Sequence, residues 1–400
     1  MNRNLNSTVV FVAFLLFSLC LNAAMKEVWS KSFPLEGDSV ELAGDIKLDN
    51  IKNSIYITGL KCIKEGEGTR GIVAVRKIDL EGKQIWKQIC DIGVGGADEN
   101  NTLAVDKRGN VYVAGYNNTE KREKILWLRK YDPNGGIIWD KIYDMPSDGL
   151  DAEFKDMAVD ADENIYACGY KYTDKYKRDL WIRKYDALGN EIWKDVYSHS
   201  ENPIIEEQGL AVGPKGNVFV SVFQNGENQE YLLTIKKYDL NGKVLLLKQY
   251  QADGDENRIM NRIVVDVIGN IYIAGSEAIF SRGRNVFVRK FDESGLGVWS
   301  KTFPATESQY YTGIDLKVDR RMNVFVSATG GADKDEKKYS WISGLDKKSN
   351  ELWLVEYSGY SYGVKFSIME DGAVYALGTE TDKEGNSNIW VKKYMLEKVK

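Results

Sequence analysis

The residues of this chain best suited to bind a metal ion or a charged partner are carboxylates in four connecting segments. Those candidates are Asp98, Glu99, Asp148, Asp151, Glu206, Glu207, Asp253 and Asp255. Carboxylate oxygens gathered at one place can hold a divalent cation or pair with a basic partner. Ordinary solvated loop charge is the simpler interpretation, because a neighbouring set of connections is rich in lysine. We treat these residues as binding candidates and expect no cofactor, with a divalent cation as the alternative.

Other groups that could carry catalysis are scarce. His199 is the single histidine, which excludes zinc sites built from several histidines and repeated histidine acid–base chemistry. No phosphate-loop lysine pattern follows Gly95-Gly96 or Gly135-Gly136. The formal net charge of −5 offers no basic field for a polyanion, so we expect no nucleic-acid partner.

The elements that position these segments are copies of an internal repeat. Residues 106–139 and 160–193 read almost as one sequence, from an Asp-x-x-x-Asn turn to a tryptophan. A short strand typified by VYVAG recurs seven times, at intervals of 50 to 56 residues. The copies start at Ile55, Val111, Ile165, Val218, Ile271, Val324 and Val374. Self-similarity at this period is typical of ring or solenoid architectures.

Each unit holds four candidate strands separated by Asp, Gly and Asn turns. The strands are apolar on both faces: in residues 126–132, Trp127 and Tyr131 share one face, while Leu126 and Leu128 take the other. A lone sheet facing water would show one polar face, whereas a sheet packed between two others would not. The pattern therefore predicts an all-β, seven-bladed propeller of four-stranded antiparallel blades.

The two ends of the chain predict how this ring closes. Residues 27–33 match the tryptophan strand of the repeat, with Trp29 in the tryptophan position. Residues 388–394 match the strand that should precede it. One blade would then combine three C-terminal strands with one N-terminal strand, which removes open sheet edges. If the first short strand of each unit is innermost, the variable connections, including the acidic ones, leave from one rim.

The units resemble the seven-bladed propeller repeats abbreviated SBBP and, more loosely, NHL repeats. The Asp-x-x-Gly-x-x-x-Trp run also resembles the tryptophan-docking motif of quinoprotein propellers, one residue shorter. The resemblance covers nearly all of residues 27–400 and implies architecture rather than activity.

Two columns of side chains recur in the repeat. Tryptophan lies seven residues after the turn aspartate at Trp86, Trp139, Trp193, Trp299 and Trp353, with Leu246 in the fourth unit. A basic column contains Arg76, Arg129, Arg183, Lys236, Arg289 and Lys392. We expect the tryptophans to pack between blades and the basic residues to make cation–π contacts there.

The first 24 residues predict export, because a polar start with Arg3 precedes an apolar stretch too short to span a bilayer. Residues 1–24 would be a signal peptide and residues 25–400 the propeller, with no transmembrane span. Lipidation of Cys20 is an alternative, although Leu19 is an unusual preceding residue. Cys168 is expected in the core, and a Cys62–Cys90 disulfide stays open.

The function predicted from these features is that of an exported, monomeric, non-enzymatic propeller in the periplasm, at the cell surface or in the medium. It would bind a protein, a glycan or another surface partner through the variable loops of one rim. The alternative is a propeller hydrolase, lactonase or lyase with a carboxylate-bound divalent metal in the central channel.

Overall fold

The computed structural model describes the chain in fifteen stretches. They are residues 24–34, 40–65, 68–94, 102–118, 124–144, 152–174, 177–198, 205–225, 231–251, 258–279, 283–305, 309–332, 338–359, 361–381 and 387–397. Within these stretches no helix has the length and apolarity needed to cross a membrane.

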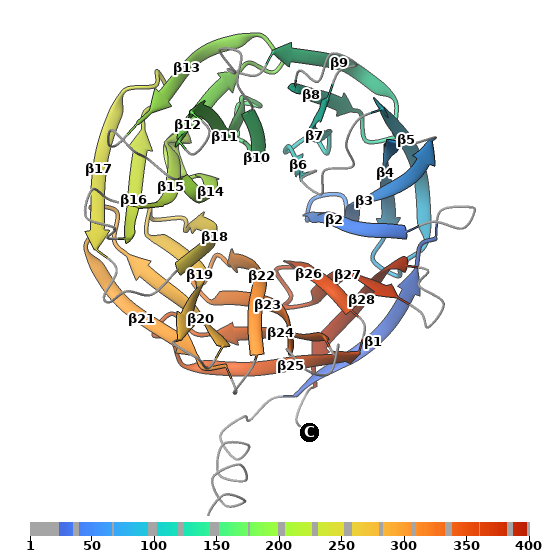
Figure 1. The fold of residues 1–400 in the computed structure, drawn as a ribbon. Coiled ribbons are helices and arrows are strands. Elements are labelled where there is room, and N and C mark those ends of the chain that lie inside the picture. The colour runs from blue at the N-terminus through green and yellow to red at the C-terminus, as the bar shows by residue number, and fades with distance from the viewer. Residues whose placement is uncertain are drawn as a thin grey trace, which may run out of the picture.

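In the described stretches, twenty-eight strands form a ring of seven four-stranded antiparallel blades (Figure 1), as the repeat predicted. The innermost strands are β2 (Val40–Asp49), β6 (Thr102–Val105), β10 (Ala152–Val159), β14 (Ile205–Val212), β18 (Arg258–Val265), β22 (Gln309–Val318) and β26 (Ser361–Ile368). The second strands are β3 (Ser54–Glu65), β7 (Val111–Asn118), β11 (Ile165–Asp174), β15 (Val218–Asn225), β19 (Ile271–Ile279), β23 (Val324–Ala332) and β27 (Val374–Thr381).

The third strands are β4 (Gly68–Asp79), β8 (Lys124–Tyr131), β12 (Lys177–Tyr185), β16 (Tyr231–Tyr238), β20 (Gly283–Phe291), β24 (Lys338–Leu345) and β28 (Ser387–Leu396). The outermost strands are β5 (Gln84–Val94), β9 (Ile137–Asp144), β13 (Glu191–Tyr197), β17 (Val244–Gln251), β21 (Gly297–Phe303), β25 (Glu351–Gly359) and β1 (Met25–Ser32). One 3-10 turn, η1 (Pro214–Gly216), follows β14. Blade one comprises β2 to β5, later groups of four make blades two to six, and blade seven joins β26, β27 and β28 to β1.

The ring closes by pairing of the two ends of the chain. β1 pairs antiparallel with β28, which places Trp29 opposite Lys393 and Ser32 opposite Trp390. Beyond the ladder, the backbone N–H of Phe33 donates to the carbonyl of Ile389 at 2.9 Å. The predicted composite blade is therefore confirmed.

Tight turns of one type occupy one rim of the ring, which we call the turn rim. In the turn from Asp106 to Asn110, the aspartate Oδ1 accepts the backbone N–H groups of Arg108 and Asn110 at 2.9 Å. Gly109 follows at φ +82°, a conformation that glycine adopts without a Cβ clash. The turns between third and outermost strands repeat this pattern, as Asp132 does with Asn134 and Gly136. Antiparallel strands then send all other connections to the opposite rim, the loop rim.

Core packing lies between blades, as the two-faced strands predicted. Trp127 and Tyr131 on one face of β8 pack with blade one, whereas Leu126 and Leu128 pack with blade three. Cys168 is buried in the core as expected. Cys90 is a free, buried thiol and forms no disulfide, and burial raises its pKa to about 11.

The tryptophan column joins each blade to the next. Five of its indole N–H groups donate to a backbone carbonyl of the following blade at 3.1–3.2 Å. The pairs are Trp29 with Leu80, Trp86 with Pro133, Trp139 with Ala187, Trp193 with Leu240, and Trp299 with Lys347. Each acceptor directly follows the turn aspartate of the neighbouring blade. The contact from Trp29 to Leu80 crosses the seam between blade seven and blade one. The predicted structural role of this column is confirmed.

The basic column makes several of the expected cation–π contacts. Lys236 and Lys392 lie over rings of the preceding blade, Tyr197 and Tyr357, at 4.6 and 5.8 Å. Arg129 instead pairs with Asp140 on the neighbouring strand. A second column, missed from the sequence, lies one residue further along. Each lysine of this column lies over an aromatic ring of the second strand in its own blade. The pairs are Lys77 with Tyr56, Lys130 with Tyr112, Lys184 with Tyr166, Lys237 with Phe219, Lys290 with Tyr272, and Lys393 with Tyr375.

Candidate functional site

Most sequence-based candidates lie outside the residues that the structure describes. These are Asp98, Glu99, Asp148, Asp151, Asp253 and Asp255, together with Cys20 and His199. Glu206 and Glu207 lie at the start of β14, the end that faces the loop rim. The backbone of Glu207 pairs with Phe223 after a bulge. Because β14 is the innermost strand of blade four, the backbone of both residues lies next to the channel.

The described residues show a different charged site inside the channel. Seven side-chain positions, one per innermost strand, share a single register, because each pairs with or adjoins the fourth residue of the VYVAG-type strand. We call them the inner ring: Asp45, Thr102, Asp156, Gly209, Arg262, Asp315 and Lys365. Irregular pairing directly precedes this position in β10, β18 and β26 and includes it in β2. Such β-bulges re-aim side chains.

Each aspartate of the inner ring ties its own strand to the next blade. Asp45 accepts the backbone N–H of Ile46 at 2.9 Å and that of Leu103 in blade two at 3.2 Å. Asp315 accepts from Leu316 at 3.0 Å and from Phe366 in blade seven at 3.2 Å. Asp156 bonds Met157 and Leu210 in the same way. These buried carboxylates therefore hold neighbouring innermost strands together.

Basic side chains balance these carboxylates. Lys47 Nζ lies 2.6 Å from Asp45, and Lys317 Nζ lies 2.8 Å from Asp315. Arg262 joins two blades: its Nη1 is 2.9 Å from Asp156 Oδ2, and its Nε is 3.2 Å from Asp315 Oδ1.

The contact from Arg262 to Asp156 passes over blade four, where the inner ring has Gly209. A Cβ added at Gly209 would lie 3.1 Å from the backbone nitrogen of Ile263. The absent side chain therefore permits β14 and β18 to approach closely, while leaving no charge between Arg262 and its distant partner.

Electrostatics of the inner ring favour the ionised forms of Asp45, Asp315 and Arg262. Burial would raise the pKa of Asp45 and Asp315, but the surrounding cations hold both well below the usual range. Burial would lower the pKa of Arg262, and its carboxylate neighbours raise it instead. Burial together with Arg262 lowers the pKa of Lys365 to about 8. The cations of the ring therefore repel one another while the carboxylates offset that repulsion.

A divalent metal does not fit this arrangement. The lone pairs of Asp45, Asp156 and Asp315 already accept backbone N–H groups and basic side chains. A bound ion of charge +2 would face Lys47, Arg262 and Lys317 at short range. Among the residues with described placement, no group of three His, Cys, Asp or Glu side chains could hold a metal ion.

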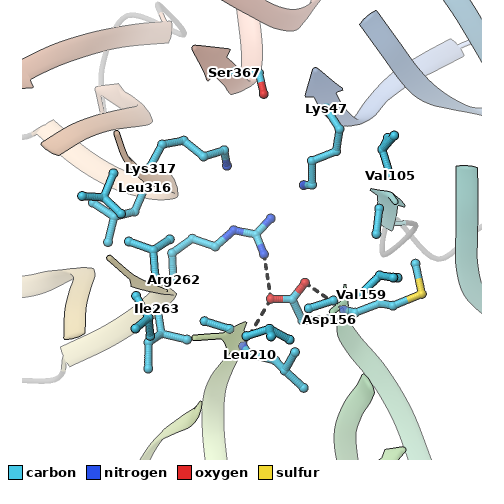
Figure 2. Close-up of a pocket in the computed structure, with 18 of the residues that line it drawn as sticks. Lys47, Val105, Asp156, Val159, Leu210, Arg262, Ile263, Leu316, Lys317 and Ser367 are labelled. Carbon is cyan, nitrogen blue, oxygen red and sulfur yellow. Dashed lines mark hydrogen bonds and ion pairs between the residues drawn. The ribbon is translucent and has the colours of Figure 1, made fainter. Parts of the chain in front are cut away.

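A cavity of about 420 Å³ lies between the inner ring and the turn rim. Figure 2 shows Lys47, Lys317 and Arg262 directed into one opening, with Asp156 beside the guanidinium. Aliphatic residues at or next to the ends of the innermost strands form the walls toward the turn rim: Leu48, Val105, Val159, Val212, Val265, Val318 and Ile368. The cavity thus has a charged floor and an apolar entrance.

Sequence reasoning missed the inner ring, although a signal for it was present. The residue before each short apolar strand reads Asp, Thr, Asp, Gly, Arg, Asp and Lys across the seven copies. This position varies in charge, while the residue that follows it is a large apolar one in every copy. Comparison of the copies position by position, rather than loop by loop, would have found it.

Comparisons with known proteins support the fold and leave the family open. No family model matches the chain, and no curated protein matches it. A protein of unknown function from Dyadobacter fermentans has a similar structure, with a TM-score of 0.50, 9% identity, and coverage of 93% of this chain and 99% of that one.

Two further solved structures match less well. Drosophila plexin A, solved in complex with semaphorin 1b, matches with a TM-score of 0.45 and 11% identity over 92% of this chain and 87% of that one. A lignostilbene dioxygenase from Pseudomonas brassicacearum has a TM-score of 0.47 and 11% identity over 90% and 93%. Likeness at these identities concerns the fold alone, because one fold can host many functions.

Proposed function

We propose that this chain is an exported binding module that captures a protein, a glycan or another surface partner through its loop rim. The observation that carries the proposal is the division of the ring into two unlike rims. Repeated, Asp-capped turns occupy the turn rim, whereas every connection of non-repeating sequence leaves from the loop rim. Variable segments on a rigid scaffold are where recognition residues are commonly found.

The chemistry of the described channel supports binding over catalysis. Neighbouring cations hold the pKa of Asp45 and Asp315 well below the usual range, so these two carboxyl groups are poorly suited to act as general acids at neutral pH. The metal-dependent hydrolase, lactonase or lyase alternative would need carboxylates free to coordinate an ion, which the inner ring does not offer. The acidic candidates of the loop rim then serve as contacts for a basic or hydroxyl-rich partner.

Export rests on residues 1–24, whose sequence has the features of a cleaved leader. Intact-mass measurement of the protein recovered from producing cells tests this step. Cleavage after Ala24 leaves an unmodified amino terminus, whereas lipidation of Cys20 adds the mass of acyl chains. A full-length chain that retains Met1 and stays inside the cell would contradict export.

The test of the rim is a variant in which all eight acidic candidates become alanine. Its matched control removes three exposed carboxylates from the turn rim, Glu81, Asp162 and Glu293. Both proteins and the parent are applied to a glycan array and are photo-crosslinked at the surface of producing cells. We expect the parent and the control to capture the same partner and the eight-residue variant to lose it. Equal capture by all three proteins would overturn the proposed rim.

A further inference from the structure

The cavity on the turn side of the inner ring carries excess positive charge. Three basic side chains and one acidic side chain line it, namely Lys47, Lys317, Arg262 and Asp156, which gives two net positive charges. The carboxylates that balance the two lysines are buried behind them: the side chains of Asp45 and Asp315 are 2% and 0% exposed, against 29% and 23% for Lys47 and Lys317. The open surface therefore presents ammonium and guanidinium groups.

These cations keep donor capacity after their internal bonds are made. An ammonium group has three N–H donors, and the guanidinium group has five. Lys47 uses one donor on Asp45, and Arg262 uses Nε and Nη1 on its two aspartates. The remaining N–H groups can bond to a ligand in the opening that Figure 2 shows.

The rest of the cavity determines the size and polarity of the part of the ligand beyond its charged group. Small and aliphatic side chains such as Ala104, Ala158 and Ala211 leave room beside the lysines, and the aliphatic ring at the entrance surrounds the path to the turn rim. Ser367 adds one hydroxyl group from blade seven, between the strands that carry Lys317 and Lys47. A volume of about 420 Å³ falls within the range of small-molecule sites.

We propose that this cavity binds a small aliphatic carboxylate, with its head group between Lys47, Lys317 and Arg262 and its chain toward the turn rim. An anion there relieves the mutual repulsion of the three cations without displacing Asp45 or Asp315. The same repulsion contributes to the lowered pKa of Lys317, whose largest cause is burial. This site is separate from the loop rim, so its test does not depend on the surface partner.

Calorimetric titration with four probes tests separately whether the ligand must be an anion and whether it must carry an aliphatic chain. The probes are hexanoate, hexylammonium, acetate and inorganic phosphate. We expect hexanoate to bind saturably with a Kd of about 1 mM or tighter, and to bind more tightly than acetate or phosphate, which lack the aliphatic chain. Hexylammonium should not bind. Equal binding of hexylammonium and hexanoate, or no saturable binding of hexanoate, would overturn the proposal.

Variants place the bound probe in this cavity. Lys317→Met should weaken hexanoate about tenfold or more, because a charge-assisted hydrogen bond is lost. Since that variant also removes a partner of Asp315, a second variant, Ser367→Asp, keeps every existing ion pair and puts a carboxylate into the cavity. It should abolish hexanoate binding while the protein stays folded.

The matched control, Lys194→Met, removes an exposed lysine of β13 and should leave the affinity unchanged. Unchanged affinity in folded Ser367→Asp would place the probe elsewhere and contradict the assignment.

Discussion

The periphery of the ring and its innermost strands follow different rules. At the periphery, one contact repeats from blade to blade, as when Trp86 donates to Pro133 and Trp139 donates to Ala187. At the channel, the inner ring changes from Asp to Thr, Gly, Arg and Lys at one register. Repetition suits packing, because every interface between blades presents the same space to fill. A position that changes charge from blade to blade can instead define a single asymmetric site.

The largest effect expected is at the seam. Removal of residues 388–400 deletes nearly all of β28, so β1 loses its partner strand and β27, still paired with β26, exposes an open edge. We expect no cooperative thermal transition and extensive aggregation, measured by calorimetry and light scattering. A control that ends at residue 397 keeps the strand and should unfold like the parent. If the longer truncation also melted like the parent, closure by β1 and β28 would be wrong.

The next largest effect is expected at Arg262. Arg262→Met leaves Asp156 and Asp315 without this cation in a buried site, which should cost about 3–5 kcal/mol in the free energy of unfolding. The control is Arg320→Met, which breaks an exposed pair with Glu370 and should cost less than about 1 kcal/mol. Chemical denaturation measures both. Equal losses for the two variants would show that the inner ring is not a coupled buried network.

A smaller effect is expected for the tryptophan column. Trp139→Leu removes the indole bond to Ala187 and part of the inter-blade packing, so we expect a loss of about 1–3 kcal/mol. Blade four supplies the complementary variant, because it already carries Leu246. Leu246→Trp should raise the melting temperature, because Glu293, which directly follows the turn aspartate Asp292 of blade five, provides a carbonyl at the acceptor position of the column. Stabilisation by both substitutions, or by neither, would contradict a docking role for this column.

The smallest effect is expected on mild acidification. Asp45 and Asp315 have a lowered pKa in the folded protein, so their contribution to stability is present above the ordinary pKa of about 4 and falls as the pH drops toward the folded value. The loss should reach about 1 kcal/mol per carboxylate between pH 7 and about pH 3. Urea unfolding across this range measures it. Asp315→Asn should lose less on acidification than the parent, and an equal loss would assign the acid sensitivity to other groups.

The architecture could be predicted from the sequence because its signals repeat. Seven copies of one strand, a regular turn aspartate and the matching ends at Trp29 and Trp390 all point to the same closed ring. The two faces of β8 followed from alternation alone, since both sides of a blade are buried. Because the same strands and turns recur in seven copies, the assignment made in one copy could be checked against the other six.

The inner ring could not be predicted in the same way. Bulges shift the register just before Asp156, Arg262 and Lys365, so alternation along the strand does not indicate where those side chains point. Arg262 and Asp156 lie more than one hundred residues apart and meet only because Gly209 leaves the place between them without a side chain. The acidic residues that stand out in the sequence lie in connections of the loop rim and not in the channel.

The contrast between a repeating periphery and an asymmetric interior is tested most directly by a crystal structure with 6-bromohexanoate. Bromine scattering locates the chain of the ligand independently of any density for its carboxylate. We predict one bromine peak within the aliphatic ring near Val105 and Val318, with the carboxylate between Lys47 and Lys317. A peak on the outer strands, or equivalent peaks repeated from blade to blade, would show that the inner ring does not define a single site.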